Sequence, residues 1–268
     1  MEPPPAIVIA TRDRAASLTA TLERLARLPE RPEVVVVDNG SRDATVAVAL
    51  GAGARVVALG TDRGAAARNV GARLVDAPLV AFADDDSWWA PGALATVARR
   101  FAAAPQLGLV AARVLVGDAE RLDPVCAAME RGPRDALGHA VHGFVACGAV
   151  VRREAFLAAG GFHPRFGIGG EEELLARRLT ARGLRVRHQP DVVAHHHPSP
   201  ARDRQARRQR EVRNELWTRW LLDGPRGAAA ATGRALWAAR RDDAAARGTV
   251  QGLVGLPWVA RERLAHGP

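Results

Sequence analysis

The sequence predicts an α/β protein with a doubly wound, mostly parallel central sheet, flanked by helices and followed by a C-terminal helical extension. Short apolar runs alternate with helical segments through roughly the first 100 residues, which is the pattern of strand–helix units. These runs lack polar alternation, which is typical of strands buried on both faces of a parallel sheet. Apolar residues make up 48% of the 268 residues, enough for a large core.

Each predicted unit can be located along the chain. The strand runs are AIVIA (6–10), EVVVVD (33–38), RVVAL (55–59) and LVAFA (79–83). A helix is predicted over 15–28, where leucines recur at helical spacing, and another over 64–75. The turn residues NGSRDAT separate the second strand from an Ala/Val helix. Repeated units of this kind favour right-handed crossovers within one sheet.

Composition narrows the class of protein. The net charge is +9, but every basic residue is Arg and Tyr is absent, so codon bias from a GC-rich genome accounts for part of the charge. We therefore expect no nucleic-acid partner. Cys126 and Cys147 are too few for a disulfide framework and lack zinc-finger spacing. The sequence has neither a signal-like start nor an apolar stretch of about 18 residues, so we expect a cytoplasmic protein, soluble or peripheral on the inner face of the membrane.

Polar side chains follow each of the four predicted strands. In a doubly wound sheet the ligand binds beyond the carboxyl ends of the strands, so these residues are expected on one rim. They are Thr11, Arg12, Asp13, Asp38, Asn39, Thr61, Asp62, Arg63, Asp84, Asp85 and Asp86. The first strand is followed by TRDRAAS, which contains no GxGxxG pattern, and this disfavours a dinucleotide-binding dehydrogenase.

The three aspartates Asp84, Asp85 and Asp86 directly follow the fourth strand run. Clustered carboxylates repel one another unless a cation lies between them, and oxygen ligands in a D-x-D spacing suit Mg²⁺ or Mn²⁺ bridging a diphosphate. The alternative is a solvated turn in which Asp86 or Ser87 caps the next helix, with Pro91 in its first turn. The shared rim position favours the metal site.

Four longer strings resemble family 2 glycosyltransferases of the GT-A fold, in the family's order and spacing over about residues 5–200. They are IATRDR (9–14), VVVVDNGSRDAT (34–45), DRGAAARNVGARLVDAPLVAFADDDSWWAPGAL (62–94) and GGFHPRFGIGGEEELLARRLTARG (160–183). The resemblance implies a catalytic domain over 1–200, with a nucleotide-sugar half at about 1–100 and an acceptor and base half at about 101–200. It also implies a bacterial, hexosyltransferase-like enzyme of cell-envelope or glycoconjugate biosynthesis that requires Mn²⁺ or Mg²⁺.

The resemblance assigns the donor site residue by residue. Asp38 matches the residue that reads the nucleotide base, and Thr11 and Arg12 match the loop around the nucleoside. Gly64 and Arg68, in the pattern G-x-x-x-A-R-N-x-G, match positions beside the donor ribose and phosphates. The alternatives are that Gly64 only begins a helix and that Arg68 only pairs with Asp62.

Within the D-x-D element the three aspartates resemble different family positions. Asp84 resembles the residue near the ribose or the metal, and Asp86 resembles the direct metal ligand. Asp85 is assigned to the nucleotide-sugar site. Uridine is the default base that the resemblance implies, with guanosine and deoxythymidine as alternatives.

The resemblance places a general base at a helix start in GGEEELLARRLTARG. The best register makes Glu172 the base and Glu171 its neighbour, although the choice among these and Glu173 is open by one position. The alternative is an acidic first turn favoured by the helix dipole.

Two further residues are candidates for binding the acceptor. Gly143 lies in HGFVACGAVVRREAF (142–156), a string that resembles the family's central segment, where a strand approaches the sugar. Trp89 is a candidate because an aromatic ring can stack on a sugar face. For Trp89 the alternative is packing in the core.

Three consecutive histidines occur in VVAHHHPSP (192–200). In GT-A enzymes a residue downstream of the base, often His, can complete the metal shell. Adjacent residues of a strand point to opposite faces, so His195 and His197 are expected to share one side, with His196 facing away. The strand register is open, and the three are therefore kept as a group.

Residues 201–268 are the predicted helical extension. Its first part, 201–227, is rich in Arg and ends with Leu216, Trp217, Trp220 and Leu221. Acidic residues interrupt the basic ones, so an amphipathic helix docked through its tryptophans is favoured over a nucleic-acid arm. Peripheral contact of these helices with an anionic membrane, where lipid-linked acceptors reside, is a third alternative.

The sequence therefore predicts an inverting transfer of a sugar from a nucleotide-sugar donor, a UDP-sugar by default, to a hydroxyl of a glycan, lipid-linked or small-molecule acceptor. A divalent metal at Asp86 is expected to stabilise the leaving diphosphate, while Glu172 removes the acceptor proton. Two alternatives stay open. A nucleotidyltransferase would ordinarily have a Gly-rich loop after its first strand, and a non-catalytic nucleotide or carbohydrate binder would lack the base.

Overall fold

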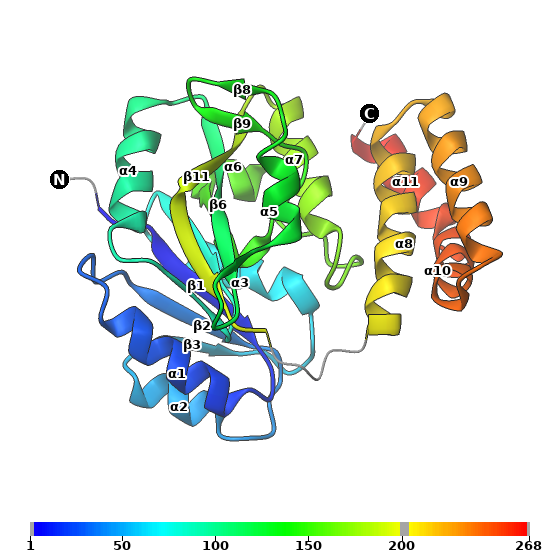
Figure 1. The fold of residues 1–268 in the computed structure, drawn as a ribbon. Helices are drawn as coiled ribbons and strands as arrows, with labels where there is room; N and C mark the ends of the chain where they lie inside the picture. The colour runs from blue at the N-terminus through cyan, green and yellow to red at the C-terminus, as the bar shows by residue number, and fades with distance from the viewer. Residues whose placement is uncertain (1–2, 199–203, 267–268) are drawn as a thin grey trace.

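One mixed sheet runs through the larger part of the molecule in the computed structural model, which describes residues 3–198 and 204–266 (Figure 1). The strand order is β3-β2-β1-β4-β10-β6-β11-β9-β8, with β5 paired to β11 and β7 paired to β6. The strands are β1 (Ala6–Thr11), β2 (Val34–Asp38), β3 (Arg55–Ala58), β4 (Leu79–Ala83), β5 (Ser87–Trp89), β6 (Leu107–Val116), β7 (Arg121–Leu122), β8 (Arg134–Asp135), β9 (Gly138–Ala140), β10 (Ala149–Arg152) and β11 (Arg185–His196).

The four strands predicted from the first part of the chain are all present and lie side by side. They are parallel in the order β3-β2-β1-β4, and Thr11 pairs with Asp38, so β1 and β2 end at the same level. Next to them β10 is antiparallel to both β4 and β6, whereas β6 and β11 are parallel. The predicted fold class, a doubly wound and mostly parallel sheet, is confirmed.

Helices cover both faces of this sheet. The helices are α1 (Ala15–Ala26), α2 (Thr45–Gly51), α3 (Ala67–Leu74), α4 (Ala93–Ala103), α5 (Pro124–Met129), α6 (Arg153–Ala158) and α7 (Glu171–Ala181), with short 3₁₀ helices η1 (Gly64–Ala66) and η2 (Ala146–Gly148). One core lies under α1, α2 and α4, and the other lies under α3, α5, α6 and α7. Along β1, Ile7 and Ile9 belong to the first core and Val8 to the second, because successive strand residues face opposite sides.

Four C-terminal helices form a separate bundle beside the sheet (Figure 1). They are α8 (Arg204–Leu222), α9 (Pro225–Ala239), α10 (Asp243–Val254) and α11 (Leu256–His266). Their core contains Trp217 and Trp220 and also takes in Phe166 and Leu174 from the α/β part. The ring of Trp217 meets that of Phe166 edge-on, with centroids 5.7 Å apart. The predicted docking of an amphipathic helix through its tryptophans is thus what the structure shows.

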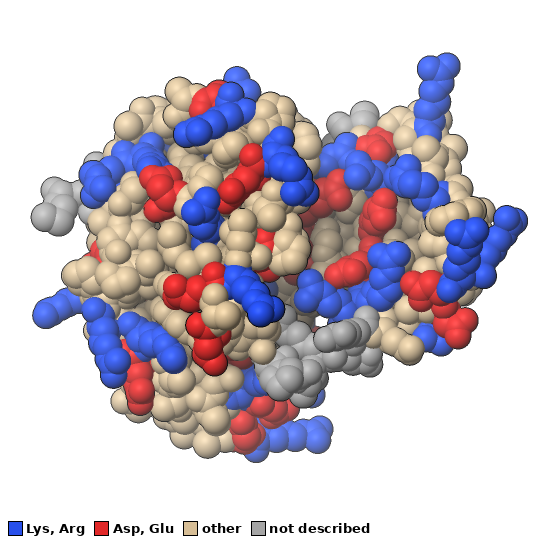
Figure 2. Space-filling view, in the orientation of Figure 1, with Lys and Arg blue, Asp and Glu red and all other residues tan. Residues whose placement is uncertain are grey.

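No helix among the described residues has both the length and the apolar composition that crossing a bilayer requires. The Arg-rich surface of α8 to α11 carries Asp and Glu side chains between the Arg side chains (Figure 2). This mixture agrees with a solvated outer face for these helices.

Candidate active site

Two adjoining cavities open at the rim where β1, β2 and β4 end. The donor cavity, as we name it, has a volume of about 540 Å³ and is lined by residues that include Thr11, Arg12 and Asp84. The base cavity, about 510 Å³, is lined by residues that include Gly143 and Glu172. Arg68, Asp84, Ile168 and Arg207 line both cavities. The rim therefore forms one continuous polar site, in the position predicted for a doubly wound sheet.

The loop after β1 forms one wall of the donor cavity. The Arg12 guanidinium donates to the Asp62 carboxylate at 3.0 Å, and Asp62 also lines the cavity. Asp62 therefore pairs with Arg12, and the alternative in which it pairs with Arg68 is wrong. Arg68 is buried, and its guanidinium donates to Asp84 instead, because α3 points this side chain at the end of β4.

Asp38 ends β2 but is not among the residues that line either cavity. Its carboxylate is buried and accepts hydrogen bonds from the backbone N–H groups of Gly40 and Ser41, and from the Ser41 hydroxyl. In this structure Asp38 holds the turn that follows β2. A role in reading the nucleotide base stays a prediction.

The three aspartates after β4 have three different environments. Asp84 is bonded to Arg68 and faces both cavities. Asp85 points back toward β1, where its carboxylate accepts from the Thr11 hydroxyl at 2.7 Å and lies 3.7 Å from Arg14 Nε. Burial raises the pKa of Asp85 to about 6, although the Thr11 hydrogen bond opposes this. Asp86 is buried, and its Oδ1 lies 3.2 Å from His196 Nε2.

The turn after the aspartates does not cap a helix. Asp86 is followed by β5, and α4 begins only at Ala93, after Gly92 at its N-cap. The alternative interpretation of the D-x-D element as a helix cap is therefore wrong. Pairing of β5 with β11 brings Asp86 next to the histidines instead.

The histidine prediction needs correction. We expected His195 and His197 on the aspartate side, but the structure places His196 there. His195 lies 3.1 Å from Glu120 and His197 lies 3.3 Å from Asp118, both on the opposite face. His195 and His197 do share one face, as predicted, but it is the face away from the aspartates. The sequence alone did not reveal that Ser87 pairs with His196, which decides the face.

These residues fit a divalent cation. One ligand atom each of Asp84, Cys147 and His196 lie within 4.8 Å of one another, and Asp86 adjoins them through His196. Carboxylate oxygen and imidazole nitrogen are donors that Mn²⁺ accepts. Burial raises the pKa of Asp85, and the negative charges of Asp84 and Asp86 raise it further. A cation bound here would offset these charges.

The predicted base lies at the start of α7, on the wall of the base cavity. Glu171 is buried and accepts from the Gly169 N–H, and Glu172 accepts from the Gly170 N–H at 3.2 Å. Burial raises the pKa of both carboxyls, and the charge of Glu172 adds to the effect on Glu171. Glu173 lies 3.2 Å from Arg219 of α8 in an ion pair. Of the three, Glu172 is partly exposed, whereas Glu171 is buried and Glu173 is held in ion pairs.

Gly64 and the loop before α7 bind the two halves of the site together. The Gly64 backbone has a φ of +53°, and a Cβ there would lie 3.0 Å from the Gly167 Cα, so this close approach requires glycine. The Ala65 N–H donates to the Gly167 carbonyl at 3.2 Å. On the other side, Asn214 of α8 donates to the Phe166 carbonyl at 2.9 Å. Gly64 therefore begins η1 and also shapes the site.

Trp89 does not line the site. It is 1% exposed and belongs to the core under α1 and α4, so the prediction of an acceptor-binding role is wrong and core packing is the outcome. The neighbouring Trp88 stacks on His195, with ring centroids 5.4 Å apart, on the face away from the aspartates. Gly143 lines the base cavity, and its role in binding the acceptor stays a prediction.

Three residues of the site were not predicted from the sequence. Arg207 and Arg210 of α8 line the donor cavity, and Cys147 of η2 lines the base cavity. The spacing of Arg207 and Arg210 puts both on one helix face, and this was the available signal for a basic wall. For Cys147 no local signal existed, because its neighbours in space come from β4 and β11.

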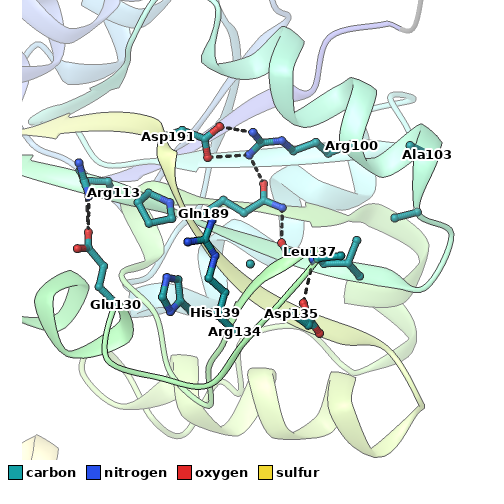
Figure 3. Close-up of a pocket in the computed structure, with 14 residues that line it drawn as sticks. Arg100, Ala103, Arg113, Glu130, Arg134, Asp135, Leu137, His139, Gln189 and Asp191 are labelled. Atoms are coloured by element: carbon teal, nitrogen blue, oxygen red, sulfur yellow. Dashed lines mark hydrogen bonds and ion pairs between the residues drawn. The ribbon is translucent and has the colours of Figure 1, made fainter.

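A larger cavity of about 710 Å³ lies away from the rim, between α4, the β8–β9 hairpin and the middle of β11 (Figure 3). We name it the hairpin pocket. In it Arg100 donates to Asp191 and to Gln189, and Arg113 donates to Glu130 at 2.8 Å. Size alone therefore does not identify the active site.

Comparisons with known proteins bear on the identity of the chain. No curated protein sequence matches it. The structure of S. aureus TarS has a TM-score of 0.64 at 16% identity, over 87% of this chain and 42% of that chain. The mannosyltransferase PcManGT from Pyrobaculum calidifontis, in complex with GDP-Man and Mn²⁺, has a TM-score of 0.65 at 20% identity, over 98% and 84%. GalNAc-T7 with UDP, GalNAc and Mn²⁺ has a TM-score of 0.61 at 14% identity, over 81% and 48%.

These identities show a shared fold, and the chain spans less than half the length of the TarS and GalNAc-T7 chains. The family model described as Glycosyl transferase family 2 matches residues 6–158, which is more than half of the chain and includes Asp38, Arg68 and the three aspartates. The chain belongs to glycosyl transferase family 2.

Proposed function

We propose that the protein transfers a sugar from a nucleoside-diphosphate sugar to a hydroxyl acceptor, with inversion at the anomeric carbon. The observation that carries this proposal is one continuous site with a cation-binding cluster in its middle and a carboxylate on its wall. Asp84 lines both cavities, His196 and Asp86 adjoin it, and Glu172 lines the base cavity. An inverting transfer needs these two chemistries on opposite sides of the reacting carbon.

The donor belongs in the cavity beside β1 and α3. We propose that Thr11, Arg12 and Gly64 border the nucleoside and ribose and that Asp38, through the turn it holds, sets the shape around the base. A UDP-sugar is the proposed donor, from the family resemblance around Asp38. A solved relative of similar fold, TarS 1–349, is in complex with UDP-GlcNAc, whereas PcManGT is in complex with GDP-Man.

We propose Mn²⁺ or Mg²⁺ as the cofactor, held by Asp86, Asp84 and His196. When bound, such a cation supplies positive charge to the oxygens of the departing diphosphate. The chain adds positive charge of its own around the same cavity from Arg68, Arg207 and Arg210. Guanidinium groups suit phosphate oxygens because their planar N–H donors can bond two oxygens at once.

Glu172 is the proposed general base. Its carboxylate accepts the acceptor proton as the acceptor oxygen forms its bond to the anomeric carbon and the bond to the diphosphate breaks. Burial raises the pKa of Glu172, which makes it a better proton acceptor than an exposed glutamate. Glu171, buried behind it, holds the Gly169 N–H and so positions the loop that carries both carboxylates. Gly143 leaves space for the acceptor in the opposite wall.

We further propose that residues 1–200 are the catalytic domain and that residues 201–268 are an extension that contacts an anionic membrane peripherally from the cytoplasmic side. The support is apolar exposure beside Arg on these helices. Trp237, Val254 and Leu264 are 56%, 76% and 87% exposed, and Arg241 stacks over Trp237. Such a combination is typical of helices that lie in a membrane interface.

The test is calorimetric titration of UDP, GDP and dTDP into the purified chain, with and without Mn²⁺, followed by a transfer assay with the matching donor. We expect one nucleotide to bind in a metal-dependent way and Asp86→Ala to lose this binding. Asp118→Ala is the matched control, because this exposed carboxylate adjoins His197 on the face of the strand opposite the metal cluster. Absence of binding by all three nucleotides, with and without Mn²⁺, would count against the proposed activity.

A further inference from the structure

The base cavity contains a thiol that the proposed reaction does not use. Cys147 lies in η2, is 2% exposed and lines this cavity together with Asp84 and His196. One ligand atom from each of these three residues lies within 4.8 Å of the other two. The donors are a carboxylate oxygen, a thiol sulfur and an imidazole nitrogen, and they come from three segments far apart in the sequence.

Contacts of the backbone position each of the three donors. Cys147 is followed by Gly148, where a Cβ would lie 2.5 Å from Val114 Cγ2, so η2 is pressed against β6. Asp84 follows β4, and its backbone N–H donates a hydrogen bond to the Ser87 hydroxyl oxygen at 2.7 Å. His196 ends β11, where it pairs with Ser87 of β5. All three residues thus lie at or beside the end of a paired strand: Asp84 after β4, Cys147 before β10 and His196 at the end of β11.

The donor set differs from the one that hard cations prefer. Mg²⁺ and Mn²⁺ are bound mainly by oxygen, whereas sulfur and imidazole nitrogen favour Zn²⁺ and related cations. In a tetrahedral site with bonds of about 2.0–2.3 Å, neighbouring ligand atoms lie roughly 3.3–3.8 Å apart. Separations below 4.8 Å reach this range with a contraction of about 1 Å.

We propose that Asp84, Cys147 and His196 form a binding site for a thiophilic divalent cation, Zn²⁺ or Co²⁺, that overlaps the site of the catalytic cation. The thiol proton is released to solvent when the sulfur binds the metal. The effect on catalysis rests on the proposed function. Cys147 raises the affinity for Zn²⁺ relative to that for Mn²⁺ at the place where the diphosphate leaves. Zn²⁺ then competes with the activating metal.

The first test is the absorption spectrum of the full chain titrated with Co²⁺. A thiolate bound to Co²⁺ gives a charge-transfer band in the near ultraviolet that oxygen and nitrogen ligands do not give. We expect this band in the wild type, its loss in Cys147→Ser, and its retention in Cys126→Ser. Cys126 is the matched control because it is the other buried cysteine, belongs to α5 and is not one of the three clustered donors.

The second test is the affinity for Zn²⁺, measured by displacement of Co²⁺, and for Mn²⁺, measured by calorimetry. We expect Cys147→Ser to weaken Zn²⁺ binding by about 10-fold or more and to change Mn²⁺ binding much less. Absence of the band in folded wild type, or an unchanged ratio of Zn²⁺ to Mn²⁺ affinity in the variant, would overturn the inference. The wild-type spectrum decides even if a variant fails to fold.

The two proposals fail in different ways. A wild type that transfers sugar with Mn²⁺ but shows no thiolate band contradicts the thiol site alone. A wild type that shows the band but binds none of the three nucleotides contradicts the proposed transfer reaction alone.

Discussion

The rim site and the hairpin pocket are both large, polar and rich in carboxylates, yet their charges behave in opposite ways. At the rim, burial raises the pKa of Asp85 to about 6 and also raises those of Glu171 and Glu172. In the hairpin pocket, the hydrogen bond from Arg187 lowers the pKa of Asp135 to about 2. For Asp85, Glu171 and Glu172, burial outweighs the hydrogen bonds and charges that lower the pKa, whereas Asp84 is paired with Arg68.

The other carboxylates of the hairpin pocket follow the same rule as Asp135. The Arg100 hydrogen bond lowers the pKa of Asp191 (Figure 3). For Glu130, burial acts to raise the pKa, but the hydrogen bonds and charges of Arg113 and His188 together lower it. In each of these three pairs a guanidinium stabilises the ionised carboxylate. The comparison teaches that uncompensated charge identifies the functional cavity better than volume does.

The largest effect is expected from Glu172→Gln at the rim. Transfer kcat should fall about 10³-fold, because the amide cannot accept the acceptor proton, while nucleotide affinity should stay within about 2-fold. The assay is steady-state transfer together with nucleotide calorimetry. Glu173→Gln is the matched control, since Glu173 pairs with Arg219. A dead Glu173 variant beside an active Glu172 variant would move the base by one position.

A smaller but still large effect is expected at the histidines. His196→Ala should weaken Mn²⁺ binding about 10- to 100-fold, because His196 adjoins Asp86, whereas His195→Ala should leave it unchanged. Mn²⁺ titration followed by electron paramagnetic resonance measures both. Equal losses of Mn²⁺ affinity in the two variants would contradict the structure, in which His196 faces the aspartates and His195 faces away.

The pH dependence of transfer sharpens the comparison further. Because the pKa of Glu172 is raised above 4.5, its base form should be lost as pH falls through a value above the ordinary glutamate range, with kcat/KM dropping about 10-fold per pH unit on that limb. A pH–rate profile in Mn²⁺ tests this. A limb with its midpoint at or below 4.5 would show that the site does not raise this pKa.

Stability should respond oppositely in the two regions. A carboxyl with a raised pKa binds its proton more tightly in the folded state, so ionised Asp85 costs stability above pH 6. Asp85→Asn should therefore stabilise the metal-free protein by about 1–3 kcal/mol at pH 8, and this gain should fade as pH drops below 6 toward 4. Denaturant unfolding in a chelating buffer measures it. A gain that is constant with pH would contradict the charge argument.

The smallest effect is expected in the hairpin pocket. The lowered pKa of Asp135 means that its ion pair with Arg187 stabilises the folded state above the ordinary aspartate pKa and is lost as pH falls toward 2. Asp135→Asn should cost less than about 1 kcal/mol at pH 7, because Asp135 is half-exposed, and transfer activity should not change. A large loss of transfer activity would break the comparison by giving this pocket a part in the reaction.

Four neighbouring parallel strands of the eleven described could be predicted from sequence. The four parallel strands appear where the apolar runs predicted them, since buried strands need continuous apolar residues. The rim residues follow from strand ends alone. Antiparallel β10 and the β5–β11 pairing could not be predicted, because they depend on long-range contacts between segments more than 60 residues apart, such as Trp89 and Ala194.

By itself the sequence determined the α/β architecture, the family and the placing of Thr11, Arg12 and the aspartates on one rim, because each follows from local pattern and chain order. Only the tertiary structure decided which histidine meets Asp86, that Trp89 is core, and that Cys147 and Arg207 reach the site. The physical reason is strand register: a shift of one residue turns every side chain to the other face, and register is set by packing across the whole sheet.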